Sequence, residues 1–569
     1  VIRGQAGGGT VTEATDAATR QALSDEEIVE VTGLGRQVAD FYGSPQDIEW
    51  GYADGELYLL QSRAITSLFP VPERPAGAEP DDLRVYFSFG AVQGMLDPMT
   101  PLGQDTIKAA FAGGGQLFGI ENVTHRNQPV LFVAAERLWA DMTGIIRNQV
   151  GRRMFLFAFG GIEPGGMQAL RSHLDDPRLS AQDGPTPQTL DRARRLAFHV
   201  LRRVPGVLRR PERSAQQLFD TLNQLVVEGQ SQMDAAPSFA AQVELIPRLA
   251  GTLFTVLVPE FLPRILVGYG PLNLLNRLAG KLAEEDPSIS AQSVLMITRG
   301  LPRNVTTEMD LSLWQTAQTI RGDEVAATAL RAGEPQALAD AYLQGQLPAV
   351  LQTALADFLE RYGMRGLAEI DLGRPRWREN PVQVFQTLQS YLAIENPEAA
   401  PDRVFRRGEI AAQQTIDDLA GAAARLRGPA AGKLVRGLAS RVRALAGLRE
   451  LPKFTIIRLM GVIRQHLLAQ GEKLVQAGVL EEADDLFFLH LDELRVLAMD
   501  APGDWKGLVR RRRAAYAQEK RRQPIPRLLL SDGTAIYEGL GAAGSDDGAI
   551  VGSPVSAGVV EGTVRVVFD

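Results

Sequence analysis

Three polar side chains, Glu49, Gln61 and Arg63, stand within two apolar segments near the start of the chain. The first segment reads DIEWGY, the second reads LYLLQSRAI, and the Asp54-Gly55 step between them is a strong signal for a hairpin turn. A carboxylate oxygen can bind a hard cation and a guanidinium can pair with phosphate oxygens, so these residue types suit an anionic ligand. The alternative is a solvent-exposed face with an incidental salt bridge.

The strand register decides whether the three side chains can act together. Residues two apart on a strand share a face, so Gln61 and Arg63 point the same way. A two-residue Asp-Gly turn pairs Glu49 with Leu60 and puts Gln61 on the other face, whereas a register shifted by one residue places Glu49 opposite Gln61. The sequence leaves both registers open, and the ligand hypothesis requires the second.

The hairpin is framed by a helix and a linker. The segment SDEEIVEVTGLGRQVADFYG predicts a helix that begins with a capping box of Ser24 and Glu27 and ends at Gly43. The proline-rich stretch SLFPVPERPAGAEPDDL then predicts a linker. Beyond it the apolar residues recur with the helical period in long stretches such as Ile410 to Leu426, so this central region should be mainly α.

Composition describes an ordinary globular protein and narrows its partners. The chain has 569 residues, of which 45% are hydrophobic and 22% charged, with a net charge of −8. A mildly acidic chain without a recognisable binding module argues against nucleic acid as a partner. The absence of cysteine excludes disulfides and fits a reducing compartment, so we expect a cytoplasmic protein. The five histidines lack the spacing of a zinc site; they are His125, His173, His199, His466 and His490.

Two further patterns invite a membrane or a nucleic-acid interpretation. The most apolar stretch, residues 249–270, is cut by Pro259, Glu260, Pro263 and Arg264 into runs too short to span a bilayer, so we expect a buried helix or pocket wall and no membrane partner. Basic clusters at residues 192–213 and 510–527 are explained more simply as solvated helix faces.

The segments PQDIEW and LYLLQSR resemble the end of the ATP-grasp nucleotide-binding domain in the pyruvate phosphate dikinase and phosphoenolpyruvate synthase superfamily. This resemblance implies that ATP and Mg²⁺ are cofactors, that Glu49 is a magnesium ligand, and that Gln61 and Arg63 approach the nucleotide phosphates. The rest of such a site, including its phosphate-binding lysine, would precede Val1. We therefore expect the sequence to be a fragment of a longer polypeptide.

The segment GSPVSAGVVEGTVRVV resembles the start of the swivelling phosphohistidine domain of the same superfamily. In that domain a downstream histidine carries phosphate from ATP to the acceptor. The resemblance places this histidine beyond residue 569, so we assign no catalytic residue within the chain.

The long region between the two ends is similar to rifampicin phosphotransferase in its order of segments, among them RVYFSFGAVQGMLDPMTPLG, GLPRNVTTEMDLSLW and RYGMRGLAEIDLGRPRWRENP. We expect a mainly α chain with a large helical central domain. It would be flanked by the helix-plus-hairpin edge of an ATP-grasp domain and by the first strands of a swivelling β/α domain. The expected parts are 1–67 (ATP-grasp end), 68–83 (linker), 84–540 (helical substrate-binding domain) and 548–569 (phosphohistidine-domain start).

The central segments hold further candidate residues, each with a structural alternative. The charges of RYGMRGLAEIDLGRPRW could form a buried ion-pair network or could lie near a docked phosphoryl group, and Arg365 and Glu369 have the spacing of a helical pair. Asp97 lies in a turn-like segment, and Thr307 and Asp310 form a plausible capping box. The candidates for the acceptor site are Met95, Asp97, Arg365, Glu369, Asp371, Arg374 and Arg376.

The resemblance implies a dikinase-type phosphotransferase that passes phosphate from ATP, through the histidine, to an acceptor in the helical domain, and releases AMP and phosphate. The acceptor would be a small molecule, either a rifamycin-like macrocycle or pyruvate. Two alternatives stay open, namely phosphoenolpyruvate synthase activity and a non-catalytic binding module for an apolar ligand. We expect the fragment alone to be inactive, and the sequence leaves its oligomeric state open.

Overall fold

The structure is a computed structural model. It describes residues 2–4, 10–12, 21–43, 45–65, 69–74, 79, 82–118, 120, 122–160, 170–171, 173–181, 187–290 and 293–537. Contacts divide the chain into two compact units, which we treat separately. The first comprises Val1–Pro70 with Arg522–Pro526, and the second comprises Val71–Arg521 with Arg527–Asp569. The expected phosphohistidine-domain start at 548–569 lies outside the described residues.

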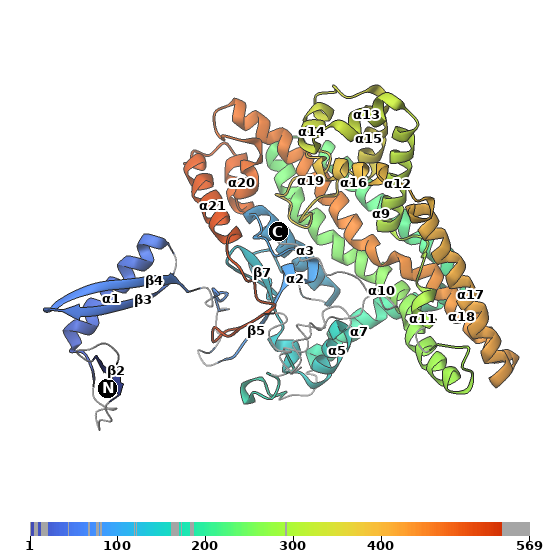
Figure 1. The fold of residues 1–569 in the computed structure, drawn as a ribbon, viewed down its shortest axis with the longest axis horizontal. Helices are drawn as coiled ribbons and strands as arrows, with labels where there is room; N and C mark the ends of the chain where they lie inside the picture. The colour runs from blue at the N-terminus through green and yellow to red at the C-terminus, as the bar shows by residue number, and fades with distance from the viewer. Residues whose placement is uncertain are drawn as a thin grey trace. The chain divides into compact units, whose positions relative to one another are not determined.

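The first unit contains one helix and two antiparallel strand pairs. Strand β1 (Ile2–Gly4) pairs with β2 (Thr10–Thr12), and β3 (Gln46–Ala53) pairs with β4 (Glu56–Ala64). Figure 1 shows helix α1 (Asp25–Tyr42) beside the long β3–β4 hairpin. The Ser24–Glu27 capping box is present, and Gly43 ends the helix in the left-handed conformation with φ of 66°. Both predicted helix boundaries are confirmed.

The second unit is mainly helical, which confirms the predicted class of the central region (Figure 1). Its α-helices are α2 (Phe89–Gln93), α3 (Pro101–Gly115), α4 (Thr143–Ile146), α5 (Gln149–Gly160), α7 (Pro187–Leu201), α8 (Val204–Arg209), α9 (Pro211–Asp234), α10 (Phe239–Glu285), α11 (Ser293–Ile297), α12 (Val305–Arg321), α13 (Glu324–Ala332), α14 (Pro335–Leu343), α15 (Ala349–Tyr362), α16 (Val382–Leu392), α17 (Pro401–Arg427), α18 (Pro429–Leu445), α19 (Leu451–Gln476), α20 (Leu491–Ala498) and α21 (Trp505–Lys520). Short 3₁₀ turns are η2 (Gln116–Phe118), η3 (Pro177–Leu179), η4 (Pro397–Ala399), η5 (Ala446–Glu450) and η6 (Ala483–Phe488).

A small antiparallel sheet joins the two ends of the helical unit. Its strand order is β6-β7-β5-β8-β9, and the strands are β5 (Val85–Ser88), β6 (Leu131–Ala134), β7 (Arg137–Asp141), β8 (Leu528–Leu530) and β9 (Ala535–Ile536). Strand β5 lies between β7 and β8, so segments far apart in the sequence share hydrogen bonds. Every residue of β5 and β8 is buried.

Helix α10 runs through the helical unit without interruption, although four prolines lie inside it. Figure 1 shows α10 and α19 side by side, and α10 also contacts α3, α9 and α18. The helix expected within this apolar stretch is thus present, and Pro259 and Pro263 do not end it, because packing against neighbouring helices offsets the missing backbone hydrogen bonds. By length and composition alone, α10 is the one candidate membrane-crossing helix in the described part of the chain, and 39% of its most apolar window is buried.

Helix α12 begins earlier than expected. Its N-cap is Asn304, whose side chain accepts hydrogen bonds from the backbone N–H groups of Thr306 and Thr307 at 3.1 and 3.2 Å. The proposed capping box of Thr307 and Asp310 is therefore wrong, because an equally good cap precedes it. Inside the helix, Asp310 instead accepts a hydrogen bond from the Tyr391 hydroxyl.

Candidate functional site

The β3–β4 hairpin has one face on helix α1 and one exposed face. Ile48 approaches α1 at Gly35, and the Tyr52 hydroxyl donates to the Glu30 carboxylate at 2.9 Å. Because side chains alternate along a strand, Glu49 lies on the opposite, exposed face. The hairpin therefore presents a polar face that α1 does not cover.

A β-bulge sets the register of this face. Ala53 pairs with Glu56 across a two-residue turn at Asp54 and Gly55, so the predicted tight turn is present. The register then shifts by one residue between Glu49 and Trp50, where Leu60 has no partner, and Glu49 pairs with Gln61. The bulge thus combines the two registers that the sequence left open, and it brings Glu49, Gln61 and Arg63 onto one face.

The side chains of this face are exposed and available to a ligand. Among the described residues, neither Glu49 nor Arg63 forms an ion pair or a side-chain hydrogen bond, so the incidental salt bridge is not formed. Asp47 pairs with Arg63 in the strand register and is exposed on the same face. Sequence analysis missed Asp47, although its position two residues before Glu49 was a usable signal.

The chemistry of this face fits a metal–phosphate ligand. Two carboxylates, Asp47 and Glu49, lie across the ladder from a guanidinium and an amide, with directly opposite Cβ atoms about 5 Å apart in such pairs. A hard cation binds through one or two carboxylates and keeps the remaining coordination for water and phosphate. Glu49 could hold such an ion while Arg63 and Gln61 bind phosphate oxygens.

A second set of predicted residues meets in the helical unit. Asp371 is fully buried and accepts three hydrogen bonds, from the Thr100 N–H at 2.9 Å, the Thr100 hydroxyl at 2.6 Å and the Gly373 N–H at 2.9 Å. Burial raises the pKa of Asp371 although these donors oppose the shift. Asp371 therefore fastens the loop after α15 to the N-terminus of α3, and it has no access to a ligand.

The other charges of this loop also have protein partners. Arg365 and Glu369 form an ion pair at 2.9 Å, but Arg365 follows the end of α15 and Glu369 lies in a turn, so the pair is not on the helix that its spacing suggested. Arg376 is 1% exposed and donates to the Glu369 carbonyl at 2.6 Å. Arg464, which sequence analysis did not single out, pairs with Glu379 at 2.7 Å and donates to the Leu372 carbonyl at 3.0 Å. These contacts are those of a buried ion-pair network.

The side chains of Asp97 and Arg374, unlike those of Asp371 and Arg376, are partly exposed. They form an ion pair at 3.3 Å, and Arg374 also donates to the Tyr516 hydroxyl at 3.0 Å. Met95, by contrast, is 5% exposed and belongs to the hydrophobic core. Of the seven candidates in the helical unit, Asp97 and Arg374 are thus the pair with most access to solvent.

Three of the five histidines are held by carboxylates. His466 Nε2 lies 2.9 Å from Asp234, and His490 Nδ1 lies 3.1 Å from Asp105. His125 is 8% exposed, and its Nε2 lies 3.4 Å from Asp492. Each of these three histidines thus has a carboxylate beside one of its ring nitrogens.

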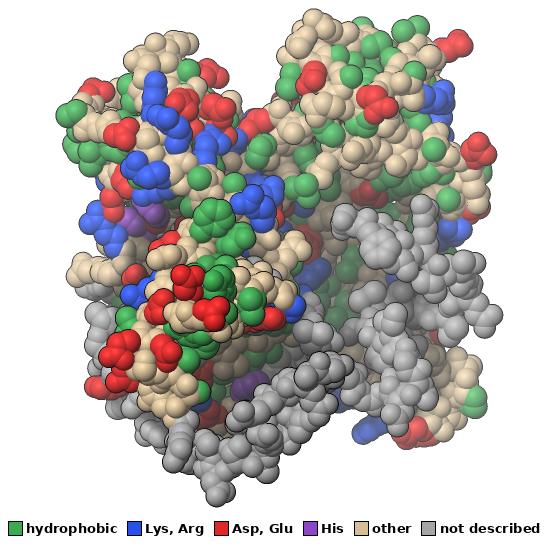
Figure 2. Space-filling view, turned by 60° about the vertical axis from the view of Figure 1, so that its left-hand side comes forward, with side chains coloured by type: hydrophobic (Ala, Val, Ile, Leu, Met, Phe, Trp, Pro, Cys, Tyr) green, Lys and Arg blue, Asp and Glu red, His purple; other side chains and the backbone are tan. Residues whose placement is uncertain are grey.

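Some arginines of the two basic clusters pair with carboxylates within the chain. Arg512 and Arg513 of α21 pair with Glu493 and with Asp485, and Arg203 pairs with Glu260 at 2.7 Å. Figure 2 shows basic and acidic side chains interspersed on the visible face. This arrangement is that of solvated, ion-paired helix faces.

Comparisons with known proteins show which enzymes the chain is similar to. Residues 260–450 match the family model for the rifampicin phosphotransferase fourth domain, and residues 1–78 match that for the pyruvate phosphate dikinase AMP/ATP-binding domain. A rifampicin phosphotransferase of Streptomyces sviceus is 32% identical over 99% of the chain, and one of Bacillus subtilis is 28% identical over 100%. Over nearly its whole length the chain is therefore similar to rifampicin phosphotransferases.

The chain spans about 61% of the length of those relatives. A phosphoenolpyruvate synthase of Pyrococcus furiosus is 55% identical, but over 51 residues that make up 9% of the chain. The hairpin with Glu49, Gln61 and Arg63 falls within the match to the AMP/ATP-binding domain. Sequence resemblance to the superfamily is thereby confirmed, while the roles of individual residues stay predictions.

Proposed function

We propose that this chain belongs to an ATP-dependent phosphotransferase that passes phosphate from ATP, through a phosphohistidine outside residues 1–569, to a rifamycin-like acceptor in the helical unit. One observation carries the proposal: the bulged hairpin brings Glu49, Gln61 and Arg63 onto one exposed face, within a segment similar to AMP/ATP-binding domains. The enzyme would release AMP and phosphate, and its expected location is the cytoplasm.

The residues of the hairpin face would bind and orient the nucleotide. Arg63 would pair with phosphate oxygens and Gln61 would donate an amide N–H, since phosphoryl transfer gains mainly from positioning and neutralised charge. Glu49, with Asp47 beside it in register, would hold Mg²⁺. When bound, the ion would supply charge neutralisation at the transferring phosphate.

The acceptor is tested with the full-length gene product. We expect AMP release from ATP and Mg²⁺ when rifampicin is added and none with pyruvate, and chelation of Mg²⁺ should abolish it. AMP release with pyruvate alone would favour phosphoenolpyruvate synthase activity. This alternative is supported by the 51-residue segment that is 55% identical to such an enzyme. Rifampicin binding without AMP from either substrate would leave a binding module.

The hairpin assignment has its own test. Glu49→Gln should lower the rate of AMP formation by about 100-fold, since it removes a fixed charge at the reacting phosphates. The matched control is Glu56→Gln, an exposed carboxylate at the tip of the same hairpin, which should keep the rate within about twofold. A Glu49→Gln enzyme with the rate of the control would refute the assignment of Glu49.

A further inference from the structure

A cavity of about 330 Å³ lies in the helical unit between α9, α12, the end of α15 and α19. Its walls are partly apolar, with Val226, Leu451 and Phe454 among them. Three arginines, Arg361, Arg378 and Arg458, also line it. Apolar walls with a few converging polar groups are typical of small-molecule sites.

Two of these arginines lack a carboxylate partner in the described part of the chain. Among the described residues, the side chain of Arg458 donates to the neutral amide of Asn223, and that of Arg378 donates to the amide of Gln465 at 3.3 Å. The nearby Glu379 carboxylate is taken by Arg464. Burial lowers the pKa of both arginines, and the charge of Arg361 lowers that of Arg458 further. Glu308 and Glu360 also line the cavity, and Glu308 lies 3.8 Å from Arg361. Among the described residues, the positive charge without a carboxylate partner therefore lies on Arg378 and Arg458.

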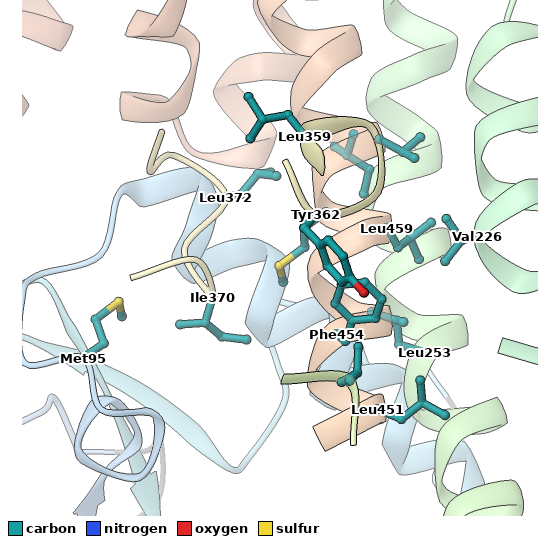
Figure 3. Packing of buried hydrophobic residues seen from close by; sticks show 14 of the residues in the cluster. Met95, Val226, Leu253, Leu359, Tyr362, Ile370, Leu372, Leu451, Phe454 and Leu459 are labelled. Carbon is teal, nitrogen blue, oxygen red and sulfur yellow. The ribbon is translucent and has the colours of Figure 1, made fainter. Parts of the chain in front are cut away.

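A buried hydroxyl that has no partner among the described residues also lines the cavity. Tyr362 is 1% exposed, and its hydroxyl makes no hydrogen bond within the described part of the chain. Figure 3 shows Tyr362 beside Phe454, and their ring centroids are 6.1 Å apart. Burial raises the pKa of Tyr362, so the hydroxyl keeps its proton and can donate. A buried donor without an acceptor is rare in native proteins, and a ligand oxygen would satisfy it.

We propose that this cavity binds a small organic anion, namely a carboxylate or phosphate monoester with an aromatic body. Arg378 and Arg458 would pair with the oxyanion, and Tyr362 would donate to one of its oxygens. The aromatic body would lie against Phe454 and the aliphatic walls. The site is independent of the hairpin face and does not rest on the proposed phosphotransfer.

Isothermal titration calorimetry of the full chain tests the site with benzoate, phenyl phosphate, inorganic phosphate and benzamide. We expect saturable binding of one or both aromatic anions, at least tenfold weaker binding of inorganic phosphate, and no binding of benzamide, which lacks the charge. Benzoate and phenyl phosphate distinguish a carboxylate from a phosphate ligand. Failure of both aromatic anions to bind, or equal affinity for benzamide, would overturn the proposal.

Variants assign the binding to named side chains. Arg458→Gln should weaken binding of the preferred anion at least tenfold, because a charge-assisted hydrogen bond is lost. Arg436→Gln is the matched control, since Arg436 lies exposed on α18 away from the cavity lining, and it should leave the affinity unchanged. Unchanged affinity of Arg458→Gln would overturn the proposal.

Tyr362→Phe separates a ligand role from a structural one. Removal of an unpaired buried hydroxyl should leave the thermal midpoint of the free protein unchanged or raise it, whereas anion binding should weaken about three- to tenfold. A lowered midpoint with unchanged affinity would show that the hydroxyl serves the fold, and it would remove Tyr362 from the site.

Discussion

Replacing Asp371 by alanine removes the acceptor of three hydrogen bonds at the junction between the loop after α15 and helix α3. The Thr100 N–H, the Thr100 hydroxyl and the Gly373 N–H would all lose their partner in a region closed to water. The guanidinium of Arg376, which donates to the Asp371 carbonyl at 3.2 Å, would also lose the nearby negative charge. The perturbation therefore leaves several buried donors and one buried cation uncompensated.

The expected cost follows from these contacts. Each buried donor left unsatisfied costs about 1–3 kcal/mol, and the Thr100 hydroxyl can rotate to reduce its share. Asp371 itself is costly to bury, as its raised pKa indicates, and its removal recovers part of that cost. We expect a net loss of about 3–5 kcal/mol in the free energy of unfolding, the range measured when one partner of a buried pair is removed.

Urea unfolding followed by tryptophan fluorescence measures this loss. Asp357→Ala on the exposed face of α15 is the control and should change stability by less than about 0.5 kcal/mol. A double-mutant cycle with Thr100→Val should show a coupling of about 1–2 kcal/mol between the two side chains. If Asp371→Ala cost less than about 1 kcal/mol, the view of Asp371 as a structural anchor would be wrong and a ligand role would become the better explanation.

Two further predictions concern packing and pH. A methyl group on Gly113 would lie 2.2–2.5 Å from the backbone of Gly251 in α10, so Gly113→Ala should destabilise by about 2–3 kcal/mol in urea unfolding, whereas Gly280→Ala, with open space around it, should stabilise by about 0.5–1 kcal/mol. Equal effects of the two substitutions would contradict this contact. Partial burial alone would raise the pKa of Asp492, but hydrogen bonds from Arg126 and Arg495 lower it to about 2. The pKa of Asp492 in the folded protein is below the unfolded value of about 3.9. The contacts of Asp492 with the two arginines therefore add about 1–2 kcal/mol to the free energy of unfolding above a pH of about 3.9, and this contribution is lost as the pH falls towards 2. The stability difference between the parent and Asp492→Asn, measured from pH 7 to 2, should therefore shrink below pH 4, and a constant difference would refute the pKa.

Part of the hairpin structure could be predicted from its local sequence pattern. Alternation and the Asp54-Gly55 step predict two strands and a tight turn, and both are present. The bulge at Leu60 could not be predicted, because an extra residue leaves the alternation on either side of it intact. The decisive feature of the face, the pairing of Glu49 with Gln61, therefore required the structure.

Two features of the helical unit show the limits of local propensity. Pro259 and Pro263 weaken a helix locally, yet α10 is held by neighbours on several sides, and this outweighs the local preference. The start of α12 depends on Asn304 rather than Thr307, and both residue types are good caps. Local propensity thus offered two acceptable starts for α12, and the structure shows the earlier one.

The charged loop after α15 shows why residue types alone cannot separate a structural network from a ligand site. Arginines and carboxylates at close spacing suit both, and the difference lies in whether each charge finds a protein partner. Asp371 accepts a hydrogen bond from Thr100, which is 271 residues away in sequence. It also packs closely against α3, since a methyl group on Gly103 would lie 2.0 Å from its carboxylate. The side chain of Arg378, in the same loop, donates a hydrogen bond only to the neutral amide of Gln465 among the described residues. The sequence-based candidates thus include the anchors of the loop, whereas the proposed anion site uses an arginine that the same pattern did not single out.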